Sequence, residues 1–162
     1  MSGRRAVAKQ GWRAALWMLA LVGLWAPGCS SQAQSSSAGE EPSGKPIATL
    51  QEFKDKIGAS AKPVVVDFQA EWCGWCKRMA PSLRAMEEQY KGRVVFYSID
   101  IDRVPEVAHQ QGIEGVPTLM FFVGGKQWGQ PAVGYQTPEQ LKGLMEKLVS
   151  SAATASAQTG RE

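Results

Sequence analysis

The sequence predicts an α/β fold in which a central mixed β-sheet is flanked by helices on both faces. Helical and strand patterns alternate along the chain in the order α-β-α-β-α-β-β-α, which is typical of a sheet covered by helices. The first strand pattern is an unbroken apolar, β-branched run, and such runs indicate a strand that is buried on both sides. We expect one folded unit over residues 47–149, long enough to bury a real core.

The first three elements are predicted from capping residues and periodicity. Thr49 and Glu52 form a capping box that starts a helix, and an apolar strand over residues 63–68 follows it. A second helix is predicted over residues 73–90, because apolar residues recur there at helical spacing. Pro81 lies inside this helix, so we expect a kink at that point.

The remaining elements follow the same logic. Residues 94–99 form the second predicted strand, and a short helix over residues 104–111 ends at a glycine. A third strand, residues 118–123, turns at two glycines into a weaker strand that ends near Val133. The last helix begins at a second capping box, residues 137–140, and carries a regular apolar stripe.

The residues most informative about function are the six letters WCGWCK at positions 72–77. Cys73 falls at the first turn of a predicted helix, where unpaired N–H groups and the helix dipole favour a thiolate. Cys76 lies one turn further on, close enough to form a disulfide with it. A stabilised thiolate with a second thiol beside it predicts thiol–disulfide exchange.

Two other interpretations of the cysteine pair stay open at this point: a structural disulfide and half of a zinc site. A stable zinc site needs three or four ligands, and the single histidine, His109, is distant in sequence. A structural bridge would not need the accessible flanks that Trp72 and Gly74 provide. We therefore expect no metal, and no cofactor other than the redox-active pair itself.

The first 28 residues, 1–28, are predicted to be a lipoprotein-type signal peptide. Four basic residues and no acidic one precede an uncharged stretch, residues 14–26, which is too short to span a bilayer. Cys29 follows the letters APG, a site that resembles those where a bacterial lipoprotein is cleaved and its cysteine lipidated. Such sites usually have leucine where this chain has Ala26. Ordinary cleavage nearby, which would leave Cys29 free, is the alternative.

The segments on either side of the folded unit, residues 29–46 and 150–162, are rich in small polar residues and lack an apolar period. We therefore expect a disordered linker and a disordered tail. Without residues 1–28, the chain has 14 basic side chains (18 − 4) and 15 acidic ones, a net charge of −1. This balance offers no basic surface of the kind that nucleic-acid binding requires.

Over residues 64–149 the sequence resembles the thioredoxin family. The matching segments occur in the family's order and at its spacing. They are VDF, AEWCGxCK, AP, ID, GIxGVPT, GGK and VG. A lone CxxC pair is a weak signal. The pair joined to a later Val-Pro-Thr and a preceding aspartate is much more specific. The resemblance implies the thioredoxin fold and a protein-disulfide oxidoreductase.

The resemblance also implies roles for individual residues. Cys73 is the exposed nucleophile that attacks a substrate disulfide, and Cys76 resolves the mixed disulfide. Pro117 is expected to follow a cis bond that places the Val116 backbone opposite Cys73, where it can pair with an extended substrate. A trans proline at the start of a strand is the alternative. The other residues expected to bind substrate are Trp72, Gly74 and Trp75.

Asp67 ends an otherwise apolar strand, and burial there would raise its pKa and make it a candidate proton carrier for Cys76. An exposed carboxylate is the alternative. The chain departs from the family nearby: Trp75 replaces a proline, Gln69 a tryptophan and Ser98 a lysine. The first change means that the family's reduction potential does not transfer, and the last removes a charged partner of Asp67.

These features predict an exported, monomeric thiol–disulfide oxidoreductase on the periplasmic side of a bacterial membrane, anchored by lipid at Cys29. Its partners would be disulfide-containing envelope proteins and a membrane protein that delivers electrons to it. A reductase is favoured over a disulfide-forming oxidase because the surrounding residues look more like thioredoxin. A peptide-binding module with incidental cysteines is the remaining alternative.

Overall fold

The computed structural model describes residues 43–159, and its elements confirm the predicted α/β class. The six-stranded sheet has the order β1-β3-β2-β4-β5, and β6 pairs with β4. Strand β3 runs parallel to β1 and β2, whereas β4 runs antiparallel to β2, β5 and β6, so the sheet is mixed. The predicted signal peptide, Cys29 and the linker up to residue 42 lie outside the described residues.

The strands in chain order are β1 (Lys45–Pro46), β2 (Val64–Gln69), β3 (Val95–Asp100), β4 (Thr118–Val123), β5 (Lys126–Gln127) and β6 (Ala132–Val133). The helices are α1 (Leu50–Gly58), α2 (Gly74–Gln89), α3 (Pro105–Gln110) and α4 (Pro138–Thr159). The capping box at Thr137 is complete, and at Thr49 the Glu52 carboxylate accepts from the Ala48 N–H instead of the Thr49 N–H. The Thr49 hydroxyl accepts from the Glu52 N–H at 3.0 Å, and the Thr137 hydroxyl accepts from the Gln140 N–H at 3.3 Å.

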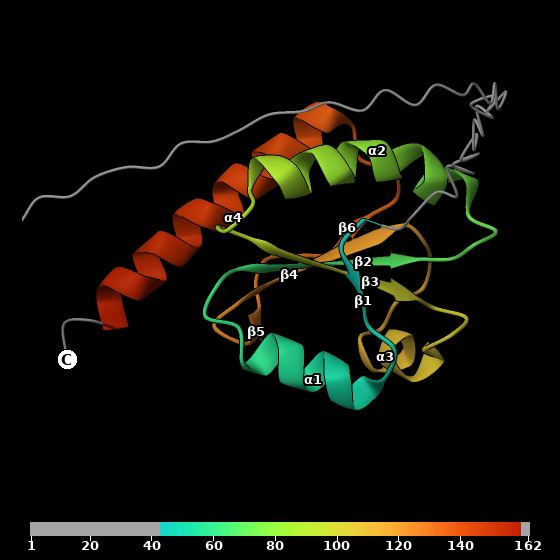
Figure 1. Ribbon diagram of the computed structural model, residues 1–162, viewed down its shortest axis with the longest axis horizontal. Coiled ribbons are helices and arrows are strands. Elements are labelled where there is room, and N and C mark those ends of the chain that lie inside the picture. Colours follow the sequence, from blue (N-terminus) through green and yellow to red (C-terminus); the bar gives the residue numbers. More distant parts are fainter. Residues whose placement is uncertain (1–42, 160–162) are drawn as a thin grey trace, which may run out of the picture. The chain divides into compact units, whose positions relative to one another are not determined.

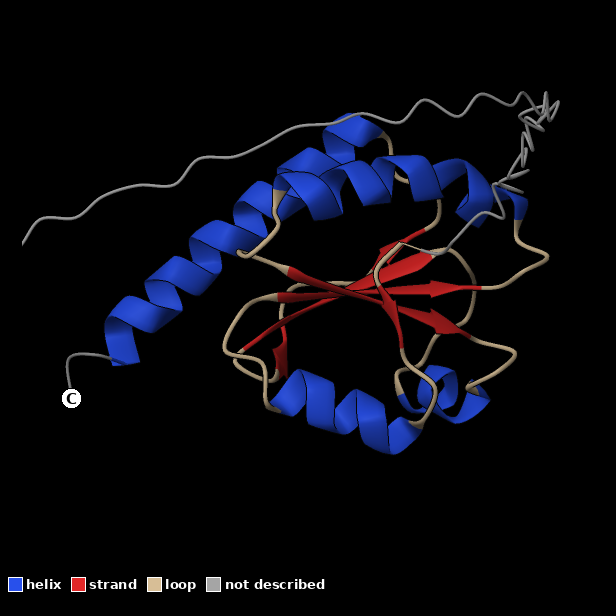
Figure 2. Ribbon diagram, in the orientation of Figure 1, coloured by secondary structure: helices blue, strands red, loops and turns tan. Residues whose placement is uncertain are grey.

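Helices cover both faces of the sheet, as predicted: α2 and α4 lie on one face, and α1 and α3 on the other (Figures 1 and 2). Each face has its own apolar cluster. Val64, Val66 and Phe68 of β2 belong to the cluster on the α1/α3 face, and Val65 belongs to the cluster on the α2/α4 face. Successive strand residues point to opposite faces. Asp67 therefore shares the α2/α4 face with Val65.

The prediction that the linker extends to residue 46 is wrong at its end. Lys45 and Pro46 form an edge strand paired with β3, and Ser43 is buried. Gly44 makes this path possible. It has a φ of +81°, and a Cβ built on it would lie 2.8 Å from the backbone carbon of Phe96. Only glycine fits such a close approach at a positive φ.

The predicted disordered tail begins at Ser150, but α4 continues to Thr159. Alanine is the strongest helix former, and four hydroxyl side chains here donate to the carbonyl oxygen four residues earlier, those of Ser150, Ser151, Thr154 and Ser156. The single weak strand predicted to end near Val133 is instead two short strands, β5 and β6, both paired with β4. Within residues 43–159, no helix is long and apolar enough to cross a membrane.

Candidate functional site

The two cysteines form a disulfide at the start of α2, directly after β2. Cys73 is the N-terminal capping residue of α2, and its sulfur accepts a hydrogen bond from the Cys76 N–H at 3.0 Å. The Cα atoms of the pair are 5.3 Å apart. In the reduced protein, the same N–H and the positive end of α2 would stabilise a thiolate at Cys73.

The prediction that Cys73 is exposed is wrong for this oxidised state. Cys73 is 5% exposed and Cys76 is 4% exposed. The reason is that each sulfur covers the other, and Ala70, Ile101 and Val116 pack around the pair. The neighbours of Cys73, Trp72 and Gly74, are nevertheless exposed. The neighbours of Cys76, Trp75 and Lys77, are exposed as well, so the buried disulfide is flanked by exposed residues.

The Val116–Pro117 peptide bond is cis. Val116 packs against the disulfide cluster, and Pro117 is buried at the start of β4. The Pro117 carbonyl accepts from the Gly134 N–H at 2.8 Å, whereas the Val116 backbone makes no hydrogen bond to another described residue. The backbone groups of Val116 are therefore available to a segment that pairs with them beside the disulfide.

Asp67 is buried, which excludes the exposed alternative. It is 5% exposed, and burial raises its pKa to about 7. Its Oδ2 accepts a hydrogen bond from the Ser43 hydroxyl at 3.4 Å, which acts in the opposite direction. Its Oδ1 has no partner among the described residues. A carboxyl with a pKa near neutrality can both take up and give back a proton under physiological conditions.

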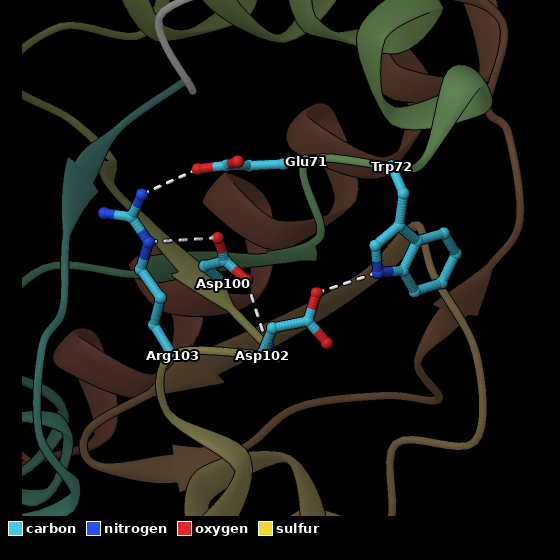
Figure 3. Close-up of polar contacts among 5 residues, drawn as sticks. All are labelled: Glu71, Trp72, Asp100, Asp102 and Arg103. Atoms are coloured by element: carbon cyan, nitrogen blue, oxygen red, sulfur yellow. Dashed lines mark hydrogen bonds and ion pairs between the residues drawn. The ribbon is translucent and has the colours of Figure 1, made fainter.

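A polar network holds the loop that carries Trp72 (Figure 3). The Trp72 indole N–H donates to Asp102 Oδ2 at 2.8 Å, and the Asp102 N–H donates to Asp100. Arg103 joins Asp100 to Glu71, the residue before Trp72, through ion pairs of 3.4 and 2.6 Å. The indole ring is thereby fixed at its nitrogen while 68% of the residue stays exposed.

Trp75, the residue between the cysteines that departs from the family pattern, lies on the surface. It is 56% exposed, and its ring centroid is 5.6 Å from that of Tyr135, in the segment between β6 and α4. The Arg78 guanidinium lies 4.9 Å from the Trp75 centroid, one turn along α2. Trp72, Trp75 and Tyr135 are therefore aromatic groups of the surface around the disulfide, and Arg78 is a cation beside them.

Sequence reasoning missed three residues that support this site: Ser43, Arg103 and Tyr135. Each is brought to the site by a segment distant in sequence. The one available signal is Gly44, because a glycine can mark a close approach of two backbone segments. In the part of the chain that the structure covers, no group of three or more His, Cys, Asp or Glu side chains could hold a metal ion. His109 lies on α3.

In both sequence and structure, the chain is similar to thioredoxins. The thioredoxin family model matches residues 45–147. The chain is 39% identical over 92 residues to thioredoxin 1 of Chlorobaculum tepidum, which covers 56% of this chain and 91% of that protein. It is 44% identical over 88 residues to a thioredoxin of Alicyclobacillus acidocaldarius subsp. acidocaldarius, covering 54% and 83% respectively.

Solved structures agree with the sequence comparison. Plasmodium falciparum thioredoxin superposes with a TM-score of 0.59 at 35% identity, over 64% of this chain and 97% of that one. Oxidised mitochondrial thioredoxin 3 of Saccharomyces cerevisiae gives a TM-score of 0.60 at 30% identity, over 65% and 96%. The cysteine pair, the adjoining cis-proline and these matches lead to one conclusion: the chain belongs to the thioredoxin family and is a thiol–disulfide oxidoreductase.

Proposed function

We propose that this oxidoreductase reduces disulfides of other proteins in the bacterial cell envelope, to which a lipid on Cys29 anchors it. The observation that carries the catalytic part is the Cys73–Cys76 pair at the start of α2, beside the Val116 backbone, which is unpaired among residues 43–159. The location rests on the N-terminal sequence, in which an uncharged stretch precedes Cys29.

The proposed reaction starts from the reduced pair. The Cys73 thiolate attacks one sulfur of a substrate disulfide, a mixed disulfide forms, and the other substrate sulfur leaves as a thiolate. Asp67 accepts the proton of the Cys76 thiol. The resulting Cys76 thiolate attacks the Cys73 sulfur, breaks its bond to the substrate and releases the second substrate thiolate. The substrate gains two electrons, and the pair becomes the disulfide seen in the structure.

The surface around the pair would hold the substrate. An extended segment pairs with the Val116 backbone in the manner of an added β-strand, and the exposed rings of Trp72 and Trp75 contact side chains next to the substrate cysteine. Gly74 leaves room between these two rings. The return to the dithiol requires two electrons, which we assign to a membrane protein that transfers them across the bilayer.

An insulin-reduction assay tests the catalytic proposal. With dithiothreitol as the electron source, the wild type accelerates insulin precipitation, and Cys73→Ser is expected to fall to the rate of dithiothreitol alone. Equal rates in the two proteins would show that the cysteines are incidental and would support a peptide-binding module instead.

The direction of electron flow is tested by the reduction potential of the Cys73/Cys76 couple in glutathione buffers. Potentials in this superfamily run from about −270 mV for reductants to about −120 mV for strong oxidants. We expect a value in the lower half of this range. A value near the upper end would identify an oxidase. Incorporation of labelled palmitate into the wild type and its absence from Cys29→Ser would support the anchor.

A further inference from the structure

We propose that Ser43 is a positioning residue for Asp67, which it binds at Oδ2 so that Oδ1 is the atom that receives the proton of Cys76. The inference rests on the proton-carrier role proposed for Asp67 and assigns the two oxygens of its carboxyl group different tasks. Ser43 lies in the segment expected from sequence to be linker.

The contact between Ser43 and Asp67 is supported by the backbone that follows Ser43. Ser43 is 3% exposed, and its hydroxyl donates to Asp67 Oδ2 at 3.4 Å. On its C-terminal side, Gly44 approaches the Phe96 backbone closely, and its N–H donates to Glu87 of α2 at 3.0 Å. Strand β1 then pairs with Tyr97 and Ser98 of β3. The backbone after Ser43 is therefore fixed to both β3 and α2.

The two oxygens of Asp67 have different surroundings as a result. Oδ2 has the Ser43 hydroxyl, whereas Oδ1 is buried and has no partner among the described residues. An unpaired buried oxygen is costly, so Oδ1 has the greater tendency to bind a proton. Asp67 lies on the face of the sheet that α2 covers, and Cys76 is buried on the first turn of α2.

Few other charges reach this carboxyl. Its neighbours across the sheet, Ser98 on β3 and Leu119 on β4, do not titrate near neutrality. Helix α2 brings Cys76, which titrates when reduced, Glu87, which binds Gly44, and the half-buried Arg84; its other charged side chains, Lys77, Arg78 and Glu88, are exposed. The side chain of Lys45 on β1 is exposed, and so are the charged side chains of α4 on this face: Glu139, Lys142, Glu146 and Lys147. Among the described residues, the Ser43 hydroxyl is therefore the group that donates a hydrogen bond to this carboxyl.

Removal of the Ser43 hydroxyl should raise the pKa of Asp67. A hydrogen bond to a carboxylate stabilises its charged form, so the pKa of Asp67 in Ser43→Ala rises from its value of about 7. One lost hydrogen bond to a charged group corresponds to a shift of about one pH unit. At pH 7 the deprotonated fraction of Asp67 then falls about fivefold, and the resolving step slows in proportion.

Two measurements test the inference. The first is the titration of the Asp67 carboxyl carbon by NMR in the oxidised protein. The second is the pH dependence of thionitrobenzoate release by Cys76 from a Cys73–thionitrobenzoate mixed disulfide, formed with Ellman's reagent. In Ser43→Ala we expect both midpoints to rise by about one unit, with rates that converge with the wild type above about pH 9.

The controls separate this inference from the proposed function. Ser98→Ala removes a buried serine that neighbours Asp67 but shows no hydrogen bond to it among the described residues, so both midpoints should stay at the wild-type value. Ser43→Thr keeps a hydroxyl and should restore them. An unchanged Asp67 midpoint in Ser43→Ala would overturn the role of Ser43. Wild-type release by Asp67→Asn would instead overturn the proton-carrier role of Asp67, whatever Ser43 does.

Discussion

The two faces of the central sheet are built from the same strands but for different purposes. On the α1/α3 face, Val64, Val66 and Phe68 of β2 enter a cluster of hydrophobic side chains that contains no charged group. On the α2/α4 face, Val65 is followed by Asp67, a carboxyl with one buried oxygen that has no partner in the described part of the chain, and β2 leads to the cysteine pair. The comparison indicates that both faces supply apolar packing, while the α2/α4 face also gives up some stability for chemistry.

The largest expected effect is the loss of insulin turnover when Cys76, on the α2/α4 face, is replaced. In Cys76→Ser the mixed disulfide on Cys73 cannot be resolved within the protein, so insulin turnover should fall by at least about a thousandfold, because an intramolecular attack is replaced by a bimolecular one. A covalent adduct with the substrate should accumulate on non-reducing gels. The matched control is Cys29→Ser, which leaves the pair intact. Wild-type turnover by Cys76→Ser would contradict the two-cysteine mechanism.

A change confined to the α1/α3 face should affect stability alone. Phe68 is fully buried there, and Phe68→Ala should lower the free energy of unfolding by about 3–5 kcal/mol because it removes apolar contacts and leaves a cavity. Urea denaturation of the oxidised protein measures the loss. The reduction potential of the cysteine pair should stay at the wild-type value in glutathione buffers. A shifted reduction potential together with a small loss of stability would contradict the idea that the α1/α3 face affects stability and not the redox chemistry.

Asp67→Asn should raise the free energy of unfolding near neutral pH, whereas Phe68→Ala lowers it. The folded protein raises the pKa of Asp67 from 3.8 to about 7, so the native state binds this proton more tightly than the unfolded state does. The wild type therefore loses stability as pH rises from about 4 to about 7, by an amount on the order of 4 kcal/mol. Asparagine does not titrate and avoids this loss. Urea denaturation at pH 4, 6 and 8 should show the variant gaining on the wild type, whereas parallel curves would refute the raised pKa.

The smallest of these effects concerns the rim of the site. Trp75 is exposed and contacts Tyr135 and Arg78, so Trp75→Ala should leave folding unchanged and weaken only the contact with protein substrates. Loss of one aromatic contact of about 1 kcal/mol corresponds to a KM for insulin that is about fivefold higher. The rate with Ellman's reagent, which is too small to span the rim, serves as the control. Equal losses with both substrates would place Trp75 in the chemistry instead.

The helices and strands on both faces could be predicted from sequence because their signals are local. The capping boxes at Thr49 and Thr137, the apolar run of β2 and the helical spacing in α2 each fall within a few residues. The cysteine pair, Pro117 and Asp67 were found for a similar reason, since they lie in family motifs of fixed spacing.

What the sequence did not predict depends on contacts between distant segments. The sequence assigns Ser43 to the linker because its neighbours are small and polar. Its burial depends on the pairing of β1 with β3 and on the close approach of Gly44 to the Phe96 backbone. Burial of Cys73 depends on Ile101 and Val116, which other loops supply. The sequence assigns the helix after Ser150 to the tail because it has no apolar stripe, and none of its described residues is buried, yet its alanines favour the helical backbone.

The most direct test of the redox site is the rate at which Cys73 of the reduced protein reacts with iodoacetamide near pH 6. The start of α2 should hold this sulfur as a thiolate, so its alkylation, located by mass spectrometry in a Cys29→Ser background, should be about tenfold faster than that of free cysteine. A rate equal to that of free cysteine would mean that the helix does not activate the sulfur, and the mechanism proposed for this site would be wrong.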